Sequence, residues 1–182
     1  MERNSMKISV RDMVFTALFA AVLCVVAPFS IAIGPVPLSF ATLVIYIAAG
    51  ALDWKLGVIS TLLYVMIGAV GVPVFSNFEG GFHKIAGVTG GFIIGYIPCA
   101  LATGVIFDFF KKKLRSYILG MITGTILLYL CGVAWFMLQT GSPLRVALAL
   151  CVTAFIPGDT IKIVLACIVT PQLRKALEPM RR

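Results

Sequence analysis

The chain has 182 residues, of which 60% are hydrophobic and only 12% are charged, and its mean hydropathy is +1.06. This composition is typical of an integral membrane protein and excludes a separate soluble domain, so we expect residues 1–182 to form a single membrane domain. The net charge of +8 comes from basic residues that form no groove-reading motif. It therefore argues against nucleic-acid binding and favours attraction to the anionic lipid of a bilayer.

Six apolar segments, separated by charged or Pro/Gly-containing breaks, are candidate transmembrane helices. In chain order they are roughly 13–33, 38–52, 56–72, 85–107, 117–138 and 146–169. A helical span needs about 20 apolar residues, so the second segment is short. It follows Gly34-Pro35-Val36-Pro37, where two prolines favour an extended start. Five spans with one re-entrant segment therefore remain an alternative to six.

The basic residues are unevenly divided among the connections. The N-terminal segment, the turn before the third segment, the connection after the fourth and the C-terminal tail hold 12 of the 15. They are Arg3, Lys7, Arg11, Lys55, Lys111, Lys112, Lys113, Arg115, Arg174, Lys175, Arg181 and Arg182. The other connections hold only Lys84 and Arg145. By the positive-inside rule both termini are cytoplasmic and the number of spans is even, which predicts an all-α membrane protein with six transmembrane helices.

The connection at 71–84 combines aromatic residues with glycines. Phe75, Phe78 and Phe82 need a surface on which to pack, and the outer mouth of the bundle would provide one if this segment were a lid. The alternative is an ordinary hairpin with interfacial aromatic residues, which needs no ligand.

Paired glycines open the fourth segment. At a helix start, Gly90 and Gly91 would bring free backbone N–H groups close to a carboxylate or carbonyl. The spacing Gly91-x-x-x-Gly95 also predicts close helix packing, and Gly120-x-x-x-Gly124 repeats it in the fifth segment. Both roles are compatible.

Asp159 and Lys162 lie inside the sixth segment, which is otherwise uncharged. A charge at the centre of a membrane helix costs roughly 2.5 to 3.5 kcal/mol, so such residues are usually functional. Three positions apart, the two side chains share one helix face and can pair, but they need further polar partners, which a bound ligand would supply. Pro157-Gly158 predicts a kink immediately before the pair. The alternative is an ion pair that only fixes helix register.

Other kinds of site find no support in the sequence. The five cysteines are odd in number and lie within apolar segments without a C-x-x-C pair, and His83 is the only histidine, so we expect neither a disulfide framework nor a metal site. The chain has no G-x-x-x-x-G-K-[ST] motif for nucleotide, and no nucleophile and base spaced for an intramembrane enzyme.

Four motifs in this order resemble the BioY family, the biotin-binding S components of energy-coupling factor (ECF) transporters. They are Gly34-Pro35-Val36-Pro37, Gly71-Val72-Pro73-Val74-Phe75, Thr89-Gly90-Gly91-Phe92 and Phe155-Ile156-Pro157-Gly158-Asp159-x-x-Lys162. The resemblance covers nearly the whole chain. It implies a six-helix, multi-pass protein of a bacterial or archaeal plasma membrane, with a ligand cavity open to the outside. Phe92 replaces a tyrosine that is usual in the family.

The resemblance implies biotin as the ligand. Asp159 would accept hydrogen bonds from the ureido N–H groups, and Lys162 would balance its charge and donate to either the ureido oxygen or the tail carboxylate. The other implied contacts are the side chain of Asn77, the backbone of Gly90 and Gly91, and the apolar walls Phe75 and Phe92.

The resemblance also implies the mode of transport. Small residues in the first segment, matched here by Ala17 and Ala21, would dock on a transmembrane coupling subunit. Two cytoplasmic ATPase subunits acting through that partner would reorient the chain, so ATP would be used by the partners and this chain would need no cofactor and would not be an enzyme. The alternative is an autonomous ion-coupled vitamin carrier with Asp159 as its proton site.

Overall fold

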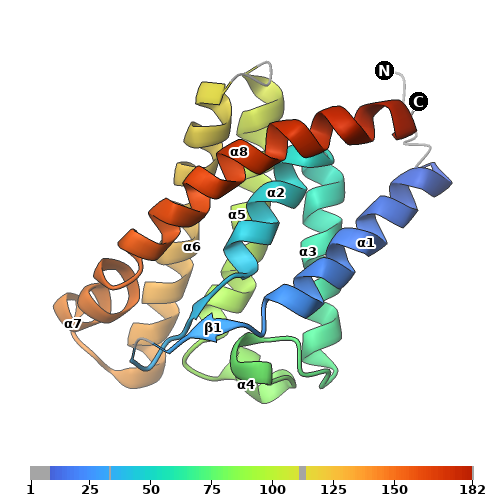
Figure 1. Ribbon diagram of the computed structural model, residues 1–182. Coiled ribbons are helices and arrows are strands. Elements are labelled where there is room, and N and C mark those ends of the chain that lie inside the picture. Colours follow the sequence, from blue (N-terminus) through green and yellow to red (C-terminus); the bar gives the residue numbers. More distant parts are fainter. Residues whose placement is uncertain (1–8, 33, 111–113, 182) are drawn as a thin grey trace, which may run out of the picture.

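The chain folds into a bundle of helices with a short β-ribbon at one end (Figure 1). The computed structural model describes residues 9–32, 34–110 and 114–181. Its elements are α1 (Val10–Val26), β1 (Ser30–Ile31), β2 (Leu38–Ser39), α2 (Ala41–Ala51), α3 (Trp54–Ala69), the 3-10 turn η1 (Ser76–Phe78), α4 (Phe82–Ala86), α5 (Gly90–Phe109), α6 (Leu114–Thr140), α7 (Leu144–Leu148), the π-helical turn η2 (Ala149–Thr153) and α8 (Ile156–Arg181). The predicted mostly helical architecture is confirmed.

Three helical segments of the described residues are long and apolar enough to cross a membrane. They are Gly90–Phe109, Leu114–Thr140 and Leu144–Leu177, and α2 and α3 are apolar but shorter. The 11 residues of α2 rise only about 16 Å at 1.5 Å per residue, roughly half the thickness of a hydrocarbon core.

The short helix α2 lies inside the bundle, where it packs against α3, α5 and α8. Most of its residues are buried, including Tyr46, whose hydroxyl lies 2.6 Å from the hydroxyl of Thr125 on α6. Because protein covers α2, its ends do not have to reach the two membrane surfaces to keep backbone groups out of lipid. Its shortness is therefore compatible with a place at membrane depth.

The helices α5 and α6 approach each other closely through glycines. A Cβ atom at Gly120 would stand 2.7 Å from the carbonyl oxygen of Thr103, and one at Gly95 would stand 3.0 Å from the side chain of Leu128. Real Cβ atoms do not approach a backbone oxygen as closely as 2.7 Å, so a larger residue at Gly120 would push the two helices apart. The close packing that the glycine spacing predicts is confirmed.

The first apolar segment is not one continuous helix to residue 33 as predicted. The helix α1 ends at Val26, two residues before Pro28, which has no N–H group to continue the helical hydrogen bonds. The chain then forms β1, which pairs antiparallel with β2 in the register Ser30 to Ser39. The end of this segment therefore forms a ribbon beside the end of the bundle.

The sixth segment is interrupted before the predicted kink. The helix α7 passes into η2, the chain turns at Ala154 and Phe155, and α8 begins at Ile156. Pro157 therefore stands in the first turn of α8, where a missing N–H group leaves no helical hydrogen bond unmade. Asp159 is in the same turn, where the helix dipole favours a negative charge. The helix α8 then runs beyond residue 169, the predicted end, to Arg181.

Arg174 connects the C-terminal half of α8 to the bundle. Its guanidinium donates to the carbonyl of Gly50 at 3.0 Å, lies 3.9 Å from Oδ1 of Asp108 and 3.8 Å from Oδ1 of Asp53, and stacks over the ring of Phe107 at 5.0 Å. These partners come from the end of α2, the turn after it and the end of α5. The long α8 is therefore held along its length, including at the end opposite Asp159.

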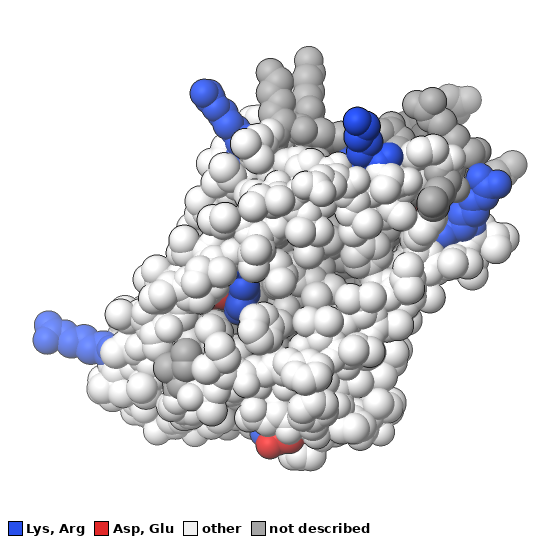
Figure 2. All heavy atoms as spheres, viewed as in Figure 1, with Lys and Arg blue, Asp and Glu red and all other residues white. Residues whose placement is uncertain are grey.

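The two ends of the bundle differ in what they contain. The start of α1, the turn between α2 and α3, the facing ends of α5 and α6 and the end of α8 lie at one end, whereas β1, α4 and α7 lie at the other (Figure 1). Most lysines and arginines in view gather near the first end (Figure 2). Of the basic residues behind the predicted orientation, Arg3, Lys7, Lys111, Lys112, Lys113 and Arg182 lie outside the described residues.

Exposed apolar side chains cover the helices between these two ends. Examples from α1, α3, α5, α6 and α8 are Val14, Leu63, Leu101, Ile122 and Leu165. Exposed surface of this composition is unfavourable in water and favourable in lipid, which is what a membrane protein requires.

Candidate ligand-binding site

Asp159 and Lys162 form an ion pair on one face of α8, as their spacing predicts. Nζ of Lys162 lies 2.8 Å from Oδ1 of Asp159, and the two side chains are only 4% and 6% exposed. A pair this deeply buried is stable only if the remaining protons and lone pairs of both groups also have partners.

The protein itself supplies those partners. Nζ of Lys162 also donates to the carbonyl oxygen of Ser39 at 2.7 Å and to Oγ1 of Thr42 at 3.1 Å, so all three N–H groups of the ammonium have acceptors. The hydroxyl of Tyr129 donates to Oδ2 of Asp159 at 2.5 Å. The expectation that only a ligand would provide polar partners is wrong, because β2, α2 and α6 provide them.

Tyr129, Thr42 and the carbonyl of Ser39 are absent from the sequence-based prediction. The sequence could have suggested Tyr129, because the hydroxyl of a tyrosine in an apolar helix needs a hydrogen-bond partner when it is buried. The sequence gives less reason to single out Thr42, because a threonine hydroxyl in a helix usually bonds to a backbone carbonyl of the same helix. The contribution of Ser39 is a main-chain atom, and no residue type would reveal it.

A small inner chamber adjoins the ion pair. Its lining comprises Pro37, Leu38, Ser39, Thr42, Phe92, Tyr96, Leu128, Tyr129, Phe155, Asp159 and Lys162. Its volume is about 30 Å³, which is enough for very few water molecules and too small for a ring system. A ligand would therefore reach the ion pair with one edge only, from a larger space next to it.

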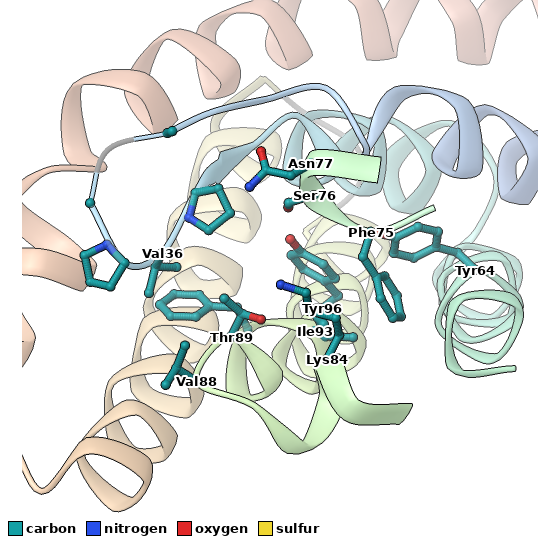
Figure 3. A pocket seen from close by; sticks show the side chains of 15 residues that line it. Val36, Tyr64, Phe75, Ser76, Asn77, Lys84, Val88, Thr89, Ile93 and Tyr96 are labelled. Carbon is teal, nitrogen blue, oxygen red and sulfur yellow. The ribbon is translucent and has the colours of Figure 1, made fainter. Parts of the chain in front are cut away.

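That larger space is an outer chamber of about 130 Å³. Its lining comprises Ala32, Gly34, Pro35, Val36, Pro37, Tyr64, Phe75, Ser76, Asn77, Lys84, Val88, Thr89, Phe92, Ile93 and Tyr96. Pro37, Phe92 and Tyr96 line both chambers, so the two adjoin. Figure 3 shows Ser76 and Asn77 on one side of the outer chamber, Thr89 and Lys84 on another, and the rings of Phe75 and Tyr64 together.

Five of the seven predicted ligand contacts lie at the two chambers. Asp159 and Lys162 line the inner one, Phe75 and Asn77 line the outer one, and Phe92 lines both. The two aromatic walls are themselves held by edge-to-face contacts. The ring centroid of Phe75 is 5.7 Å from that of Tyr64, and the centroid of Phe92 is 6.1 Å from that of Phe155.

Gly90 and Gly91, the other two predicted contacts, are outside the lining of both chambers as the structure describes it. A Cβ atom on Gly91 would stand 2.6 Å from the carbonyl oxygen of Cys131 on α6. A Cβ atom on Gly90 would meet the carbonyl of Ile85 on α4 first, and the indole nitrogen of Trp135 on α6 at 3.1 Å. The backbone N–H of Gly90 donates to the carbonyl of Gly87 at 3.0 Å. The structure therefore places Gly91 in the contact with α6, and Gly90 between α4 and α6.

Residues 71–81, which we call the lid, cover the outer chamber together with the loop that contains β1. Asn77 donates its N–H to the carbonyl of Pro28 at 3.0 Å, and its Oδ1 accepts from the hydroxyl of Ser30 at 2.8 Å. The rings of Phe29 and Phe78 meet edge to face at 5.4 Å. Asn77 and Phe78 have φ angles of 63° and 58°, a conformation that is unfavourable for a bulky residue and is maintained here by these contacts.

Ala17 and Ala21, the predicted docking residues, are not among the residues that line the two chambers. Both are exposed on α1, on the face that also exposes Val14 and Leu18. Their small side chains are therefore accessible to a partner helix from outside the bundle.

A cavity that combines aromatic and aliphatic walls with a few fixed polar groups is the usual form of a small-molecule site, and here it lies within an apolar helical bundle. The protein is therefore a membrane-embedded ligand-binding protein.

Comparison with known proteins gives its family. The chain belongs to the BioY family, whose model matches residues 1–179. It is 32% identical to the biotin transporter BioY of Thermotoga maritima over 91% of this chain and 96% of that protein. It is 35% identical to the probable biotin transporter BioY of Pyrococcus horikoshii over 90% of this chain and 96% of that protein.

A solved structure shares the fold. The crystal structure of the S-component for biotin from an ECF-type ABC transporter superposes with a TM-score of 0.85 and 27% sequence identity, covering 96% of this chain and 95% of the other. The family resemblance predicted from the four motifs is confirmed.

Proposed function

We propose that this chain is the biotin-binding S component of an ECF-type ABC transporter, a transport protein and not an enzyme. The observation that carries the proposal is the buried cluster of Asp159, Lys162 and Tyr129 beside a lid-covered chamber. It occurs in a fold that superposes on a biotin S-component, and similar chains are named biotin transporters.

The cluster has capacity for the ureido ring of biotin. Asp159 accepts one hydrogen bond on each carboxylate oxygen from the protein, whereas an ionised carboxylate offers about four acceptor sites. It can therefore accept the ureido N–H groups without losing Tyr129 or Lys162. The apolar thiophane ring and valeryl chain would then lie between Phe92 and Phe75, with Asn77 as a further polar contact.

We propose six membrane-embedded helical segments with both termini in the cytoplasm of a bacterial or archaeal cell. Basic residues alternate between connections, and the start of α1 and the end of α8 lie at the same end of the bundle (Figure 1). The chambers and the lid would then open to the outside, where biotin is captured.

The partners that this role requires are a transmembrane coupling subunit and two ATPase subunits. The exposed small residues Ala17 and Ala21 are the proposed docking face, since small side chains let a partner helix approach closely. The ATPase subunits would consume ATP, and this chain would act without a cofactor of its own.

A proton-coupled carrier would use Asp159 as its proton site. In the structure this carboxylate is already held by an ion pair with Lys162 and a hydrogen bond from Tyr129, as expected for a fixed ligand-binding group. Uptake that persists without any ATPase and collapses with an uncoupler would support the carrier instead.

Thermal unfolding of the purified chain with and without added vitamin tests whether biotin is the ligand. Because a ligand that binds only the folded state raises its stability, we expect biotin to raise the midpoint of unfolding, with riboflavin and thiamine as controls that do not. A rise with either control vitamin and none with biotin would refute the assignment.

A further inference from the structure

The tail of biotin, the ligand proposed above, ends in a carboxylate. The inner chamber is unfavourable for that carboxylate. Every N–H group of Lys162 already has an acceptor, and its charge is matched by Asp159 at 2.8 Å. A second carboxylate next to Asp159 would face a like charge in a buried setting. The tail carboxylate therefore needs a different cation, outside the inner chamber.

The outer chamber contains one. Among the described residues that line this chamber, Lys84 of α4 is the only one with an ionised side chain, and the polar groups around it, Ser76, Asn77, Thr89 and Tyr96, are neutral. Figure 3 shows the amine of Lys84 directed among the side chains that line this chamber. An anion there would meet a cation and several hydroxyl or amide groups at once.

Lys84 is at present paired with a carboxylate of the protein. Its Nζ forms an ion pair with Oε2 of Glu79, a lid residue, and the two side chains are 30% and 40% exposed. Glu79 is not among the residues that line the chamber, and its backbone carbonyl accepts the N–H of Phe75 at 2.8 Å, which closes the turn of the lid. The pair therefore links the lid to α4 at the margin of the chamber.

We propose that Lys84 binds the carboxylate of the ligand tail, and that Glu79 occupies Lys84 until the ligand replaces it. This inference rests on the proposed function, because it takes biotin as the ligand. The head group would lie at the ion pair of α8, and the tail would extend past Pro37, Phe92 and Tyr96, which border both chambers.

The exchange of one carboxylate for another is energetically reasonable. The partly exposed ion pair between Lys84 and Glu79 contributes little to stability, because water and salt screen it. The ligand can therefore displace Glu79 at small cost, and the freed carboxylate is hydrated again. The ligand carboxylate competes at a high local concentration, because the head group is already bound. The contact also gives specificity: the protein would distinguish free biotin from derivatives whose carboxylate is blocked.

The test compares biotin with biotinamide, which carries a neutral amide in place of the carboxylate. Dissociation constants would be measured by equilibrium binding to the purified full-length chain and to Lys84→Gln. We expect the unmodified chain to prefer biotin, and Lys84→Gln to bind biotin about tenfold more weakly while its affinity for biotinamide stays the same. Lys175→Gln, which removes an exposed lysine at the other end of the bundle, is the matched control and should change neither constant.

Two further readouts sharpen the test. Glu79→Gln removes the competing carboxylate and should tighten biotin binding without tightening biotinamide binding. Raising the salt concentration should weaken biotin binding to Glu79→Gln, in which no protein carboxylate competes for Lys84, more than biotin binding to Lys84→Gln, since the new contact is partly exposed.

The outcomes separate this inference from the proposed function. Equal loss of affinity for both ligands in Lys84→Gln, or no loss for either, would overturn the role of Lys84 while biotin remained the ligand. Weaker biotin binding in Glu79→Gln would overturn the role of Glu79. If the unmodified chain bound neither biotin nor biotinamide, the proposed function itself would fall, and this inference with it.

Discussion

At the scale of single residues, Asp159 is the group on which we expect ligand recognition to depend most. In Asp159→Asn an amide donor stands where the ureido ring needs an acceptor, and Lys162 loses its counter-charge. Breaking one side of a buried pair costs roughly 3 to 5 kcal/mol of stability, so we expect a lower unfolding midpoint and strongly weakened biotin binding. Both would be measured on the purified variant.

Two companion variants separate binding from folding. Replacing both members, Asp159→Asn with Lys162→Met, removes the unpaired charge and should restore much of the stability but not the binding. Thr160→Val, on the exposed side of the same helical turn, should leave both properties unchanged. If the Asp159→Asn variant folds stably and binds biotin as tightly as the unmodified chain, the ion pair has a structural role only.

For Tyr129 we expect a smaller effect on ligand binding than for Asp159. Tyr129→Phe removes the hydrogen bond to Oδ2 of Asp159 and keeps the ring, so a buried acceptor loses one partner at a cost of about 1 to 3 kcal/mol. We expect weaker biotin binding than in the unmodified chain but stronger than in Asp159→Asn, as measured by competition with labelled biotin. Tyr117→Phe near the start of α6 serves as the control, and affinities that fail to follow this order would contradict the role of Tyr129.

The same residues show what a sequence reveals about a membrane site. Asp159 and Lys162 were predictable because a charge in an apolar segment is costly and therefore conspicuous. Thr42 and the carbonyl of Ser39 were not, because a hydroxyl and a peptide group are ordinary in any helix or strand. Their meeting with Lys162, more than 100 positions away along the chain, is a product of tertiary packing.

At the scale of elements, the lid and the β1 loop contact each other over the outer chamber, so we expect their contacts to affect how fast a ligand leaves. Ser30→Ala removes the hydroxyl that bonds to Oδ1 of Asn77, a contact between two loops 47 positions apart. A hydrogen bond of this kind is worth about 0.5 to 1.5 kcal/mol, so we expect biotin to dissociate several times faster while the unfolding midpoint changes little.

The measurement is the release of labelled biotin after dilution into unlabelled ligand. Ser142→Ala, in the loop between α6 and α7, is the matched control and should release biotin at the original rate. Unchanged release from Ser30→Ala would show that the contact between the two loops does not limit ligand exit.

Element boundaries were less predictable than element positions. All six apolar segments contain helix, but the first ends at Val26 because of Pro28, and the sixth restarts at Ile156 after a π-helical turn. An apolar composition predicts that a segment is buried in protein or lipid. It does not predict whether the segment forms a helix or a strand such as β1. The glycine spacing in α5 and α6 was more informative, since a missing side chain has a direct steric consequence.

At the scale of the whole molecule, capture and transport should be separable. Replacing Ala17 and Ala21 together with Leu fills the proposed docking face on α1, while the chambers are built from other elements. We expect biotin binding by the purified chain to be nearly unchanged, whereas uptake and co-purification with the coupling complex should be lost.

Ala134→Leu, an exposed substitution of the same size on α6, is the control and should preserve uptake. Retained co-purification and normal uptake by the Ala17 and Ala21 double variant would show that this face contacts only lipid.

Equilibrium binding of labelled biotin to the purified chain, without any partner subunit, is the most direct measurement of what this protein does. A complete site within one bundle should bind biotin saturably with a stoichiometry of about one per chain, unaffected by excess riboflavin or thiamine, and the binding should be lost in Asp159→Asn. A folded chain that bound no biotin, or bound it equally well without the Asp159 carboxylate, would contradict the assignment.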